Sequence, residues 1–174
     1  MLKGRKFFQK LLRAVTLLAT LFMVFIILFI AYFTFNQSIS AEVGDIVRIR
    51  TDGILISLVR YDFVKNYTYY NPYIGGFGNA EAKEGYKFLI ILFEISSEDG
   101  REKHISKENF KLVDLNGNSF ENVPYLGANA IFDNLISSEV FQGYLVYMVP
   151  EMIKEYKITF RYGNVGVEWK IASP

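Results

Sequence analysis

The chain has 174 residues, contains no cysteine and carries a formal net charge of +1. Without cysteine it forms no disulfide framework, no thiolate metal site and no cysteine nucleophile. The first 41 residues hold five basic residues and no acidic one, so subtracting their +5 leaves −4 on the other 133 residues. A mildly acidic region of that size argues against nucleic-acid binding, because phosphate contacts need clustered Lys and Arg.

An uncharged apolar run covers residues 14–35 and directly follows a basic segment, residues 1–13. As a helix it would be roughly 33 Å long, enough to cross a hydrocarbon core of about 30 Å. We therefore predict a transmembrane signal-anchor helix over 14–35 that contacts membrane lipid. A cleaved signal peptide is the alternative, but its apolar region normally has only about 7–15 residues.

The basic residues set the expected orientation of this helix. Because Lys and Arg are retained on the cytoplasmic side, residues 1–13 should form a cytoplasmic tail. Residues 36–42 would then be a linker, and residues 43–174 an extracytoplasmic domain. The predicted protein is a single-pass protein of the cell membrane.

Short alternating runs of apolar and polar residues dominate the exterior domain, a pattern typical of a β-sandwich or barrel. The nearly continuous apolar run 86–95 predicts a central strand that is covered on both faces. Asn116-Gly117 predicts a type I′ hairpin turn, and a C-terminal hairpin should bury the only tryptophan, Trp169. The expected strands are 45–50, 54–61, 86–95, 110–115, 119–123, 144–149, 156–161 and 165–171, while 66–84 and 125–139 are expected to be irregular.

Four stretches together resemble a known family. They are Gly44-Asp45-Ile46-Val47, Gly85 followed by YKFLIILFEI, Phe110-Lys111-Leu112-Val113-Asp114 with Gly117, and Gly143-Tyr144-Leu145-Val146-Tyr147-Met148-Val149-Pro150. In order and spacing they resemble a prokaryotic domain-of-unknown-function family of secreted or membrane-anchored immunoglobulin-like domains. That family shares its fold with a small mycobacterial secreted immunoprotective antigen. The resemblance covers about residues 43–162 and implies an all-β, immunoglobulin-like antiparallel sandwich without catalytic residues to carry over.

The sequence contains few residues in patterns that indicate catalysis or metal binding. His104 is the only histidine and lies in a charged stretch, so neither a catalytic triad nor a histidine metal cluster is indicated. The sequence from Asp114 to Asn118 resembles the start of a calcium loop, but the position of the required bidentate Glu is Tyr125. We therefore expect no enzyme activity, no metal and no cofactor.

The best candidate for recognition is an aromatic loop that contains several glycines. Aromatic rings give large contact areas with little rotamer entropy to lose, which suits binding surfaces. The alternative is that these rings pack over the edge of the sandwich. Asn66-Tyr67-Thr68 also fits the N-glycosylation pattern at Asn66, if the organism glycosylates. The candidate recognition residues are Tyr67, Tyr69, Tyr70, Tyr73 and Phe77.

These features favour a non-enzymatic binding or assembly module at the cell surface, whose partner is an unknown envelope or membrane protein. A second hypothesis is a subunit of a surface filament, a secretion system or a membrane-enzyme complex. A third is an enzyme that uses loop carboxylates such as Glu81 or Glu84, although no pair of carboxylates is singled out.

Overall fold

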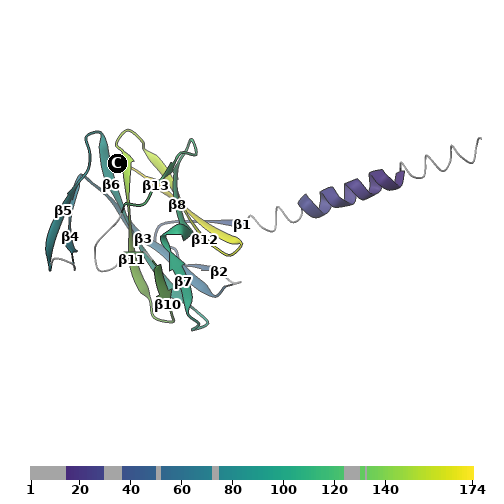
Figure 1. Ribbon diagram of the computed structural model, residues 1–174, viewed down its shortest axis with the longest axis horizontal. Coiled ribbons are helices and arrows are strands. Elements are labelled where there is room, and N and C mark those ends of the chain that lie inside the picture. The colour runs from purple at the N-terminus through teal and green to yellow at the C-terminus, as the bar shows by residue number, and fades with distance from the viewer. Residues whose placement is uncertain (1–14, 30–36, 50–51, 72–74, 124–129, 132) are drawn as a thin grey trace, which may run out of the picture. The chain divides into compact units, whose positions relative to one another are not determined.

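The computed structural model describes residues 15–29, 37–49, 52–71, 75–123, 130–131 and 133–174. The chain divides into two compact units, Met1–Gln37 and Ser38–Pro174. In the first unit residues 15–29 are helical (Figure 1), and the tail 1–13 lies outside the described residues. Across the described ranges, no helix combines the length and apolar character needed to cross a membrane. Residue 14 and residues 30–35 of the predicted anchor are not among those described.

The second unit is a β-sandwich with two main sheets (Figure 1). Each sheet has an antiparallel central ladder, β12–β13 in one sheet and β3–β6 in the other. One sheet has the order β1 (Gln37–Ala41), β13 (Val165–Ala172), β12 (Glu155–Tyr162), β8 (Phe110–Asp114) and β9 (Ser119–Phe120). The other has the order β11 (Phe141–Pro150), β6 (Tyr86–Ser97), β3 (Ile54–Val64) and β2 (Val47–Ile49).

Two smaller sheets complete the unit. One pairs β10 (Asp133–Ile136) with β7 (Lys103–Ser106), which is followed by the short 3₁₀ helix η1 (Lys107–Asn109). The other pairs β4 (Asn66–Asn71) with β5 (Gly76–Glu81).

The core lies between the two main sheets and is lined by alternate residues of each strand. In β12 the alternate residues Tyr156, Ile158 and Phe160 are buried, and in β13 the predicted tryptophan, Trp169, is fully buried. The Trp169 ring packs edge-on against Phe93 of β6, with 5.6 Å between ring centroids. Phe93 also contacts Phe110 of β8 at 4.8 Å, so aromatic rings join the two sheets.

The central position predicted for this strand is confirmed, because β6 lies between β11 and β3 and is hydrogen-bonded along both edges. Its outward face is only partly covered, since Phe88 and Leu92 are buried but Ile90 and Glu94 are half-buried. The predicted type I′ turn at Asn116-Gly117 is wrong. Three residues separate Asp114 from Asn118, and Gly117 has φ +85° whereas Asn116 does not have a positive φ. A three-residue hairpin loop with glycine in the left-handed position is therefore formed, and a type I′ turn would need positive φ at two positions.

The prediction of an irregular segment over 66–84 is also wrong. β4 and β5 form a hairpin there, with six paired positions from Asn66↔Glu81 to Asn71↔Gly76. Of the second segment expected to be irregular, 125–139, residues Asp133–Ile136 form β10. The part 125–129 and residue 132 lie outside the described residues.

Candidate functional site

The β4–β5 hairpin continues the two central strands β3 and β6 beyond the sandwich (Figure 1). The β3–β6 ladder ends at Val64↔Phe88, and the β4–β5 ladder begins at Asn66↔Glu81. The backbone N–H of Ala82 donates to the carbonyl of Lys65 at 2.8 Å and connects the two ladders. The hairpin is thus an outlying arm that is fixed at its base to the centre of one sheet.

Side chains also hold the base of this arm. The Lys65 ammonium group donates to the carbonyl oxygen of Tyr86 at 3.0 Å and forms an ion pair with Glu151 in the turn after β11. The backbone N–H of Glu151 in turn donates to the carbonyl of Gly85 at 3.0 Å. Because the two charged side chains are largely exposed, the ion pair contributes little to stability, but it orients the junction.

On one face of the hairpin, two tyrosine rings pack against the small residues of the opposite strand. Tyr67 and Tyr69 of β4 lie opposite Ala80 and Gly78 of β5, so large rings face very small partners. The Tyr69 ring covers Gly78, and Tyr67 packs edge-on against Phe88 of β6 at 4.9 Å between centroids. Tyr67 thus joins the arm to the sandwich, while Tyr69 packs within the hairpin against Tyr67 and Gly78.

The other face of the hairpin is exposed and carries a second aromatic pair. Tyr70 and Phe77 lie directly opposite each other, and their rings meet edge to face at 5.6 Å. Tyr70 is 44% exposed and Phe77 is 78% exposed. Next to them, the Thr68 hydroxyl donates to Oδ1 of Asn79 at 2.8 Å. This face presents apolar and polar groups in fixed positions.

The structure therefore separates the predicted recognition residues into two groups. Tyr70 and Phe77 face solvent together, whereas Tyr67 and Tyr69 pack inward. Tyr73 lies outside the described residues. Asn66, the predicted glycosylation position, is exposed at the start of β4.

Away from the hairpin, the candidate residues for chemistry stay apart. His104 is exposed on β7. In the described part of the chain, no group of three His, Asp or Glu side chains is arranged to hold a metal ion. Asp114, which the calcium-loop comparison singled out, instead accepts hydrogen bonds from the backbone N–H groups of Asn116 and Asn118 at 2.9 and 2.8 Å.

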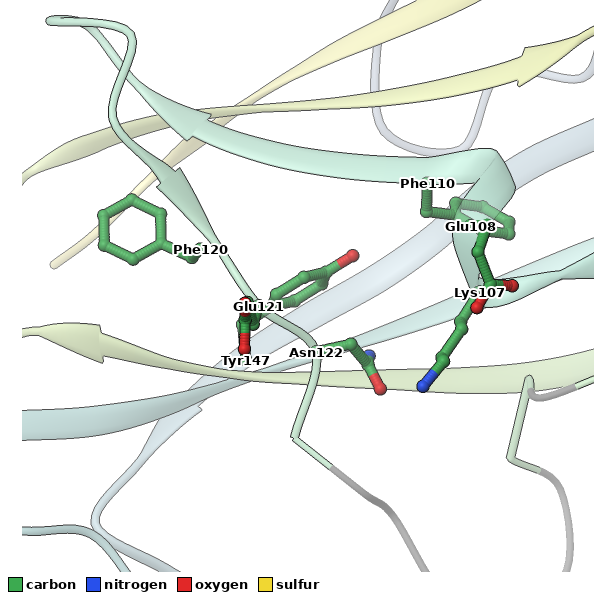
Figure 2. Close-up of a pocket in the computed structure, with 7 residues that line it drawn as sticks. All are labelled: Lys107, Glu108, Phe110, Phe120, Glu121, Asn122 and Tyr147. Atoms are coloured by element: carbon green, nitrogen blue, oxygen red, sulfur yellow. The ribbon is translucent and has the colours of Figure 1, made fainter.

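Sequence reasoning missed one further site, a cavity of about 380 Å³ near Asn122 and Tyr147 (Figure 2). These residues are 25 positions apart, and Asn122 lies in a segment that the sequence placed at the end of a strand. No local pattern signals the cavity, because it forms where the chain crosses from one sheet to the other.

The fold places this chain among the β-sandwich proteins. No protein-family model matches the sequence, and no curated protein matches it either. Among solved structures, the chain is similar to YjhA of Bacillus subtilis, with 15% identity, a TM-score of 0.56, and coverage of 75% of this chain and 98% of that one. It is also similar to an uncharacterised β-sandwich protein from Clostridium difficile 630, with 11% identity, a TM-score of 0.53 and coverage of 78% and 95%.

A third similar structure is YcdA of Bacillus subtilis, described as a candidate lipoprotein. Identity is 12%, the TM-score is 0.54, and the match covers 76% of this chain but only 39% of YcdA. The secreted Mycobacterium tuberculosis protein MPT63 also matches, at 8% identity and over 78% of this chain and 98% of its own, but with a TM-score of only 0.44. At these identities the similarities concern the β-sandwich fold, and the predicted domain-of-unknown-function family is not shown.

Proposed function

We propose that this protein is a non-enzymatic binding module, held at the outer face of the cell membrane by one N-terminal helix. The described helix supports the anchor because it is apolar around its whole circumference. Eleven of its large apolar side chains are exposed, from 48% at Val24 to 72% at Leu18. A helix of this kind needs lipid or a protein partner around it, and the basic residues before it favour a cytoplasmic N-terminus.

The observation that carries the binding role is the outer face of the β4–β5 arm. Tyr70 and Phe77 form an exposed aromatic pair on a segment that stands away from the main core. Aromatic side chains with fixed rings are the residues that dominate binding energy at protein interfaces. Their exposure on a supported hairpin favours contact with a protein partner at the membrane surface.

The edges of the same hairpin favour contact with an extended strand. Natural sheets protect exposed edges with Lys, Pro or very short strands. β4 and β5 each have six residues and contain neither Lys nor Pro, and Glu81 is their one charged residue. An unprotected edge of this length suits strand addition by a partner, in which main-chain hydrogen bonds supply affinity.

We propose that the exterior domain is an immunoglobulin-like sandwich, and its two main antiparallel sheets support this proposal. The partner is expected among envelope or membrane proteins, because the proposed anchor would tether the domain to the membrane. The candidate-lipoprotein description of YcdA agrees with an extracytoplasmic position for this fold.

Crosslinking in intact cells tests the binding role. The wild-type chain is compared with the double variant Tyr70→Ala/Phe77→Ala, and the covalently attached proteins are identified by mass spectrometry. We expect the double variant to lose at least one specific adduct while its unfolding midpoint is unchanged, because both side chains lie on the exposed face of the hairpin and outside the core.

The matched control is Leu115→Ala, which removes another highly exposed apolar side chain far along the chain in the β8–β9 loop. This variant should keep every adduct of the wild type. If both variants give the wild-type pattern of adducts, the exposed aromatic pair does not bind the partner.

A further inference from the structure

The backbone groups on the two outer edges of the β4–β5 hairpin follow from its ladder. The N–H of Ala82 donates to the carbonyl of Lys65 at 2.8 Å, which makes these two residues a hydrogen-bonded pair at the base of the hairpin. Hydrogen-bonded and non-hydrogen-bonded pairs alternate along an antiparallel ladder. The non-hydrogen-bonded pairs are therefore Asn66↔Glu81, Thr68↔Asn79 and Tyr70↔Phe77. The N–H and C=O groups of these residues point away from the hairpin along its two edges.

The outer edge of β5 is open. Its outward-pointing backbone groups belong to Phe77, Asn79 and Glu81, and β5 pairs with β4 alone among the described strands. No backbone hydrogen bond reaches these three residues from any other described segment. Such a row of N–H and C=O groups is a template for pairing with another chain. The side chains of β5 then decide which strand fits beside it.

One face of β5 is lined only by small residues, Gly76, Gly78 and Ala80. The ring of Tyr69 already covers Gly78, since its Cζ would stand 2.8 Å from a Cβ atom there. At Gly76 no described atom lies within 4 Å of such a Cβ. An aromatic ring on a neighbouring strand compensates for an edge glycine by covering its backbone. The open space at Gly76 therefore favours an aromatic side chain on an added strand.

Glu81 gives the β5 edge a negative charge. Its side chain is exposed, and it forms no ion pair in the described part of the chain. Opposite charges directly across a ladder attract each other, and like charges there are destabilising. Glu81 therefore favours Lys or Arg at the opposite position of an added strand. The β4 edge has no charged residue, and its face beside Gly78 and Ala80 holds bulky tyrosines, so β5 is the more specific edge.

We propose that an extended segment of the partner protein adds to β5 as an antiparallel strand, with Lys or Arg opposite Glu81 and an aromatic residue opposite Gly76. This proposal rests on the strand addition proposed for the β4–β5 arm, and it assigns the edge and the chemistry of the added segment. Antiparallel pairing is chosen because it is slightly more stable per residue than parallel pairing. Glu81 and Gly76 lie on opposite faces of β5, so the basic and the aromatic residue of the segment do too.

NMR titration of the isotope-labelled full chain, in a zwitterionic detergent, tests the proposal. The probe is the peptide acetyl-Lys-Val-Thr-Val-Thr-Tyr-amide, which has the proposed residues in the proposed register. The amide signals of Phe77, Asn79 and Glu81 should shift and saturate, whereas those of Thr68 and Tyr70 on the β4 edge should not. No saturable shift on β5, or equal shifts on both edges, would overturn the proposal. Concentration-dependent shifts of the β5 edge without peptide would identify a second copy of the chain as the occupant and would overturn it as well.

Two altered peptides test the two side-chain contacts. Replacing the Lys of the probe by Glu, or its Tyr by Ala, should weaken binding about threefold each, because each change removes a favourable cross-strand pair. In the variant Glu81→Lys the order should reverse, so that the peptide with Glu binds more tightly than the peptide with Lys. An unchanged order in Glu81→Lys, or equal binding of the three peptides to the wild type, contradicts the proposed register.

Two proline variants test the edge itself. Asn79→Pro and Thr68→Pro each remove one outward-pointing N–H, on β5 and on β4 respectively. Both also lose the hydrogen bond between the Thr68 hydroxyl and Oδ1 of Asn79, so they disturb the hairpin in a similar way. Asn79→Pro should abolish the saturable shifts, while Thr68→Pro should keep them. Equal affinity in the two variants would show that the main chain of β5 does not bind the segment.

The crosslinking comparison with Tyr70→Ala/Phe77→Ala reports on the arm separately. A lost adduct without peptide binding would keep the binding role of the arm and overturn the assignment of the β5 edge. Peptide binding together with an unchanged pattern of adducts would keep the β5 edge and overturn the role of the aromatic pair.

Discussion

Tyr69 lies directly across the β4–β5 ladder from Gly78, and its ring occupies the space that a side chain at position 78 would need. A Cβ atom at Gly78 would stand 2.8 Å from Cζ and 2.9 Å from the hydroxyl oxygen of Tyr69. Glycine in a strand normally weakens it, but here the ring of the cross-strand tyrosine covers the glycine backbone. The pair explains why a segment that contains Gly76 and Gly78 forms a strand.

We predict that Gly78→Ala opens the hairpin locally. The new methyl group must displace the outer end of the Tyr69 ring, and turning this side chain out of its preferred rotamer should cost about 0.5–1.5 kcal/mol in the free energy of opening. Hydrogen exchange of the Tyr69 and Ala80 amides should therefore become faster, while exchange in β12 and β13 stays unchanged. Gly76→Ala is the matched control, since it lies on the same face of β5 with nothing within 4 Å of the added atom. Equal exchange rates in the two variants would show that the Tyr69 contact does not hold the hairpin.

We predict a large loss of stability on truncating Phe93, the ring that links Trp169 and Phe110 across the core. Phe93→Ala should lower the free energy of unfolding by about 3–5 kcal/mol, through lost burial and the cavity left behind. Because Trp169 is the only tryptophan, its fluorescence during urea unfolding reports this directly. Phe77→Ala removes the same side chain at a position that is 78% exposed and should change the free energy by less than about 0.5 kcal/mol. A Phe93→Ala variant as stable as Phe77→Ala would contradict this packing.

Acid should destabilise the sandwich through Asp114. A hydrogen bond from the Asn118 side chain, together with backbone N–H donors, lowers the pKa of this carboxyl below its ordinary value. A group with a lowered folded-state pKa stabilises the fold above its unfolded pKa of about 3.9, and this stabilisation is lost as the pH falls through the folded value. The urea midpoint should therefore drop below about pH 4.

The variant Asp114→Asn distinguishes the contribution of Asp114 to acid sensitivity from the contributions of other carboxylates. It should be less stable than wild type at pH 7 and should show a shallower fall in stability below pH 4. Asp99, whose pKa is lowered chiefly by the Ser97 hydroxyl, should supply part of the fall that remains. If Asp114→Asn loses stability below pH 4 as steeply as wild type, Asp114 is not a main source of the acid sensitivity.

The strands that the sequence predicted well are those with a clear pattern of apolar residues. The alternation of apolar and polar residues around Ile158 and Trp169 indicates which side chains are buried. The continuous apolar run of β6 indicates that this strand is central in its sheet. Strands β1, β7 and β10 were not predicted, because alternation of apolar and polar residues is weak in each of them. Each of these strands pairs with a strand that is distant in the sequence, and a local sequence pattern does not identify such a partner.

The candidate site was predicted in part. The aromatic residues of the β4–β5 arm are conspicuous in the sequence, but the glycines of β5 indicated a loop. These glycines fit a strand because tyrosines lie across the ladder from them, and that pairing is visible only in the structure. The division between inward Tyr67 and outward Tyr70 follows from the two-residue period of a strand, so it could not be drawn while the segment was taken as irregular. Tyr147 was predicted in a strand, but its unpartnered hydroxyl depends on where the chain crosses between sheets.

The central claim is an anchored β-sandwich outside the membrane, and cysteine accessibility tests it most directly because the chain has no native cysteine. Met152→Cys places a thiol at a turn position that is 84% exposed, and Gln9→Cys places one in the basic N-terminal segment. In spheroplasts, a membrane-impermeant maleimide should label Met152→Cys at once and Gln9→Cys only after lysis, with both proteins resisting carbonate extraction. Labelling of Met152→Cys only after lysis, or release of the protein by carbonate, would contradict the account.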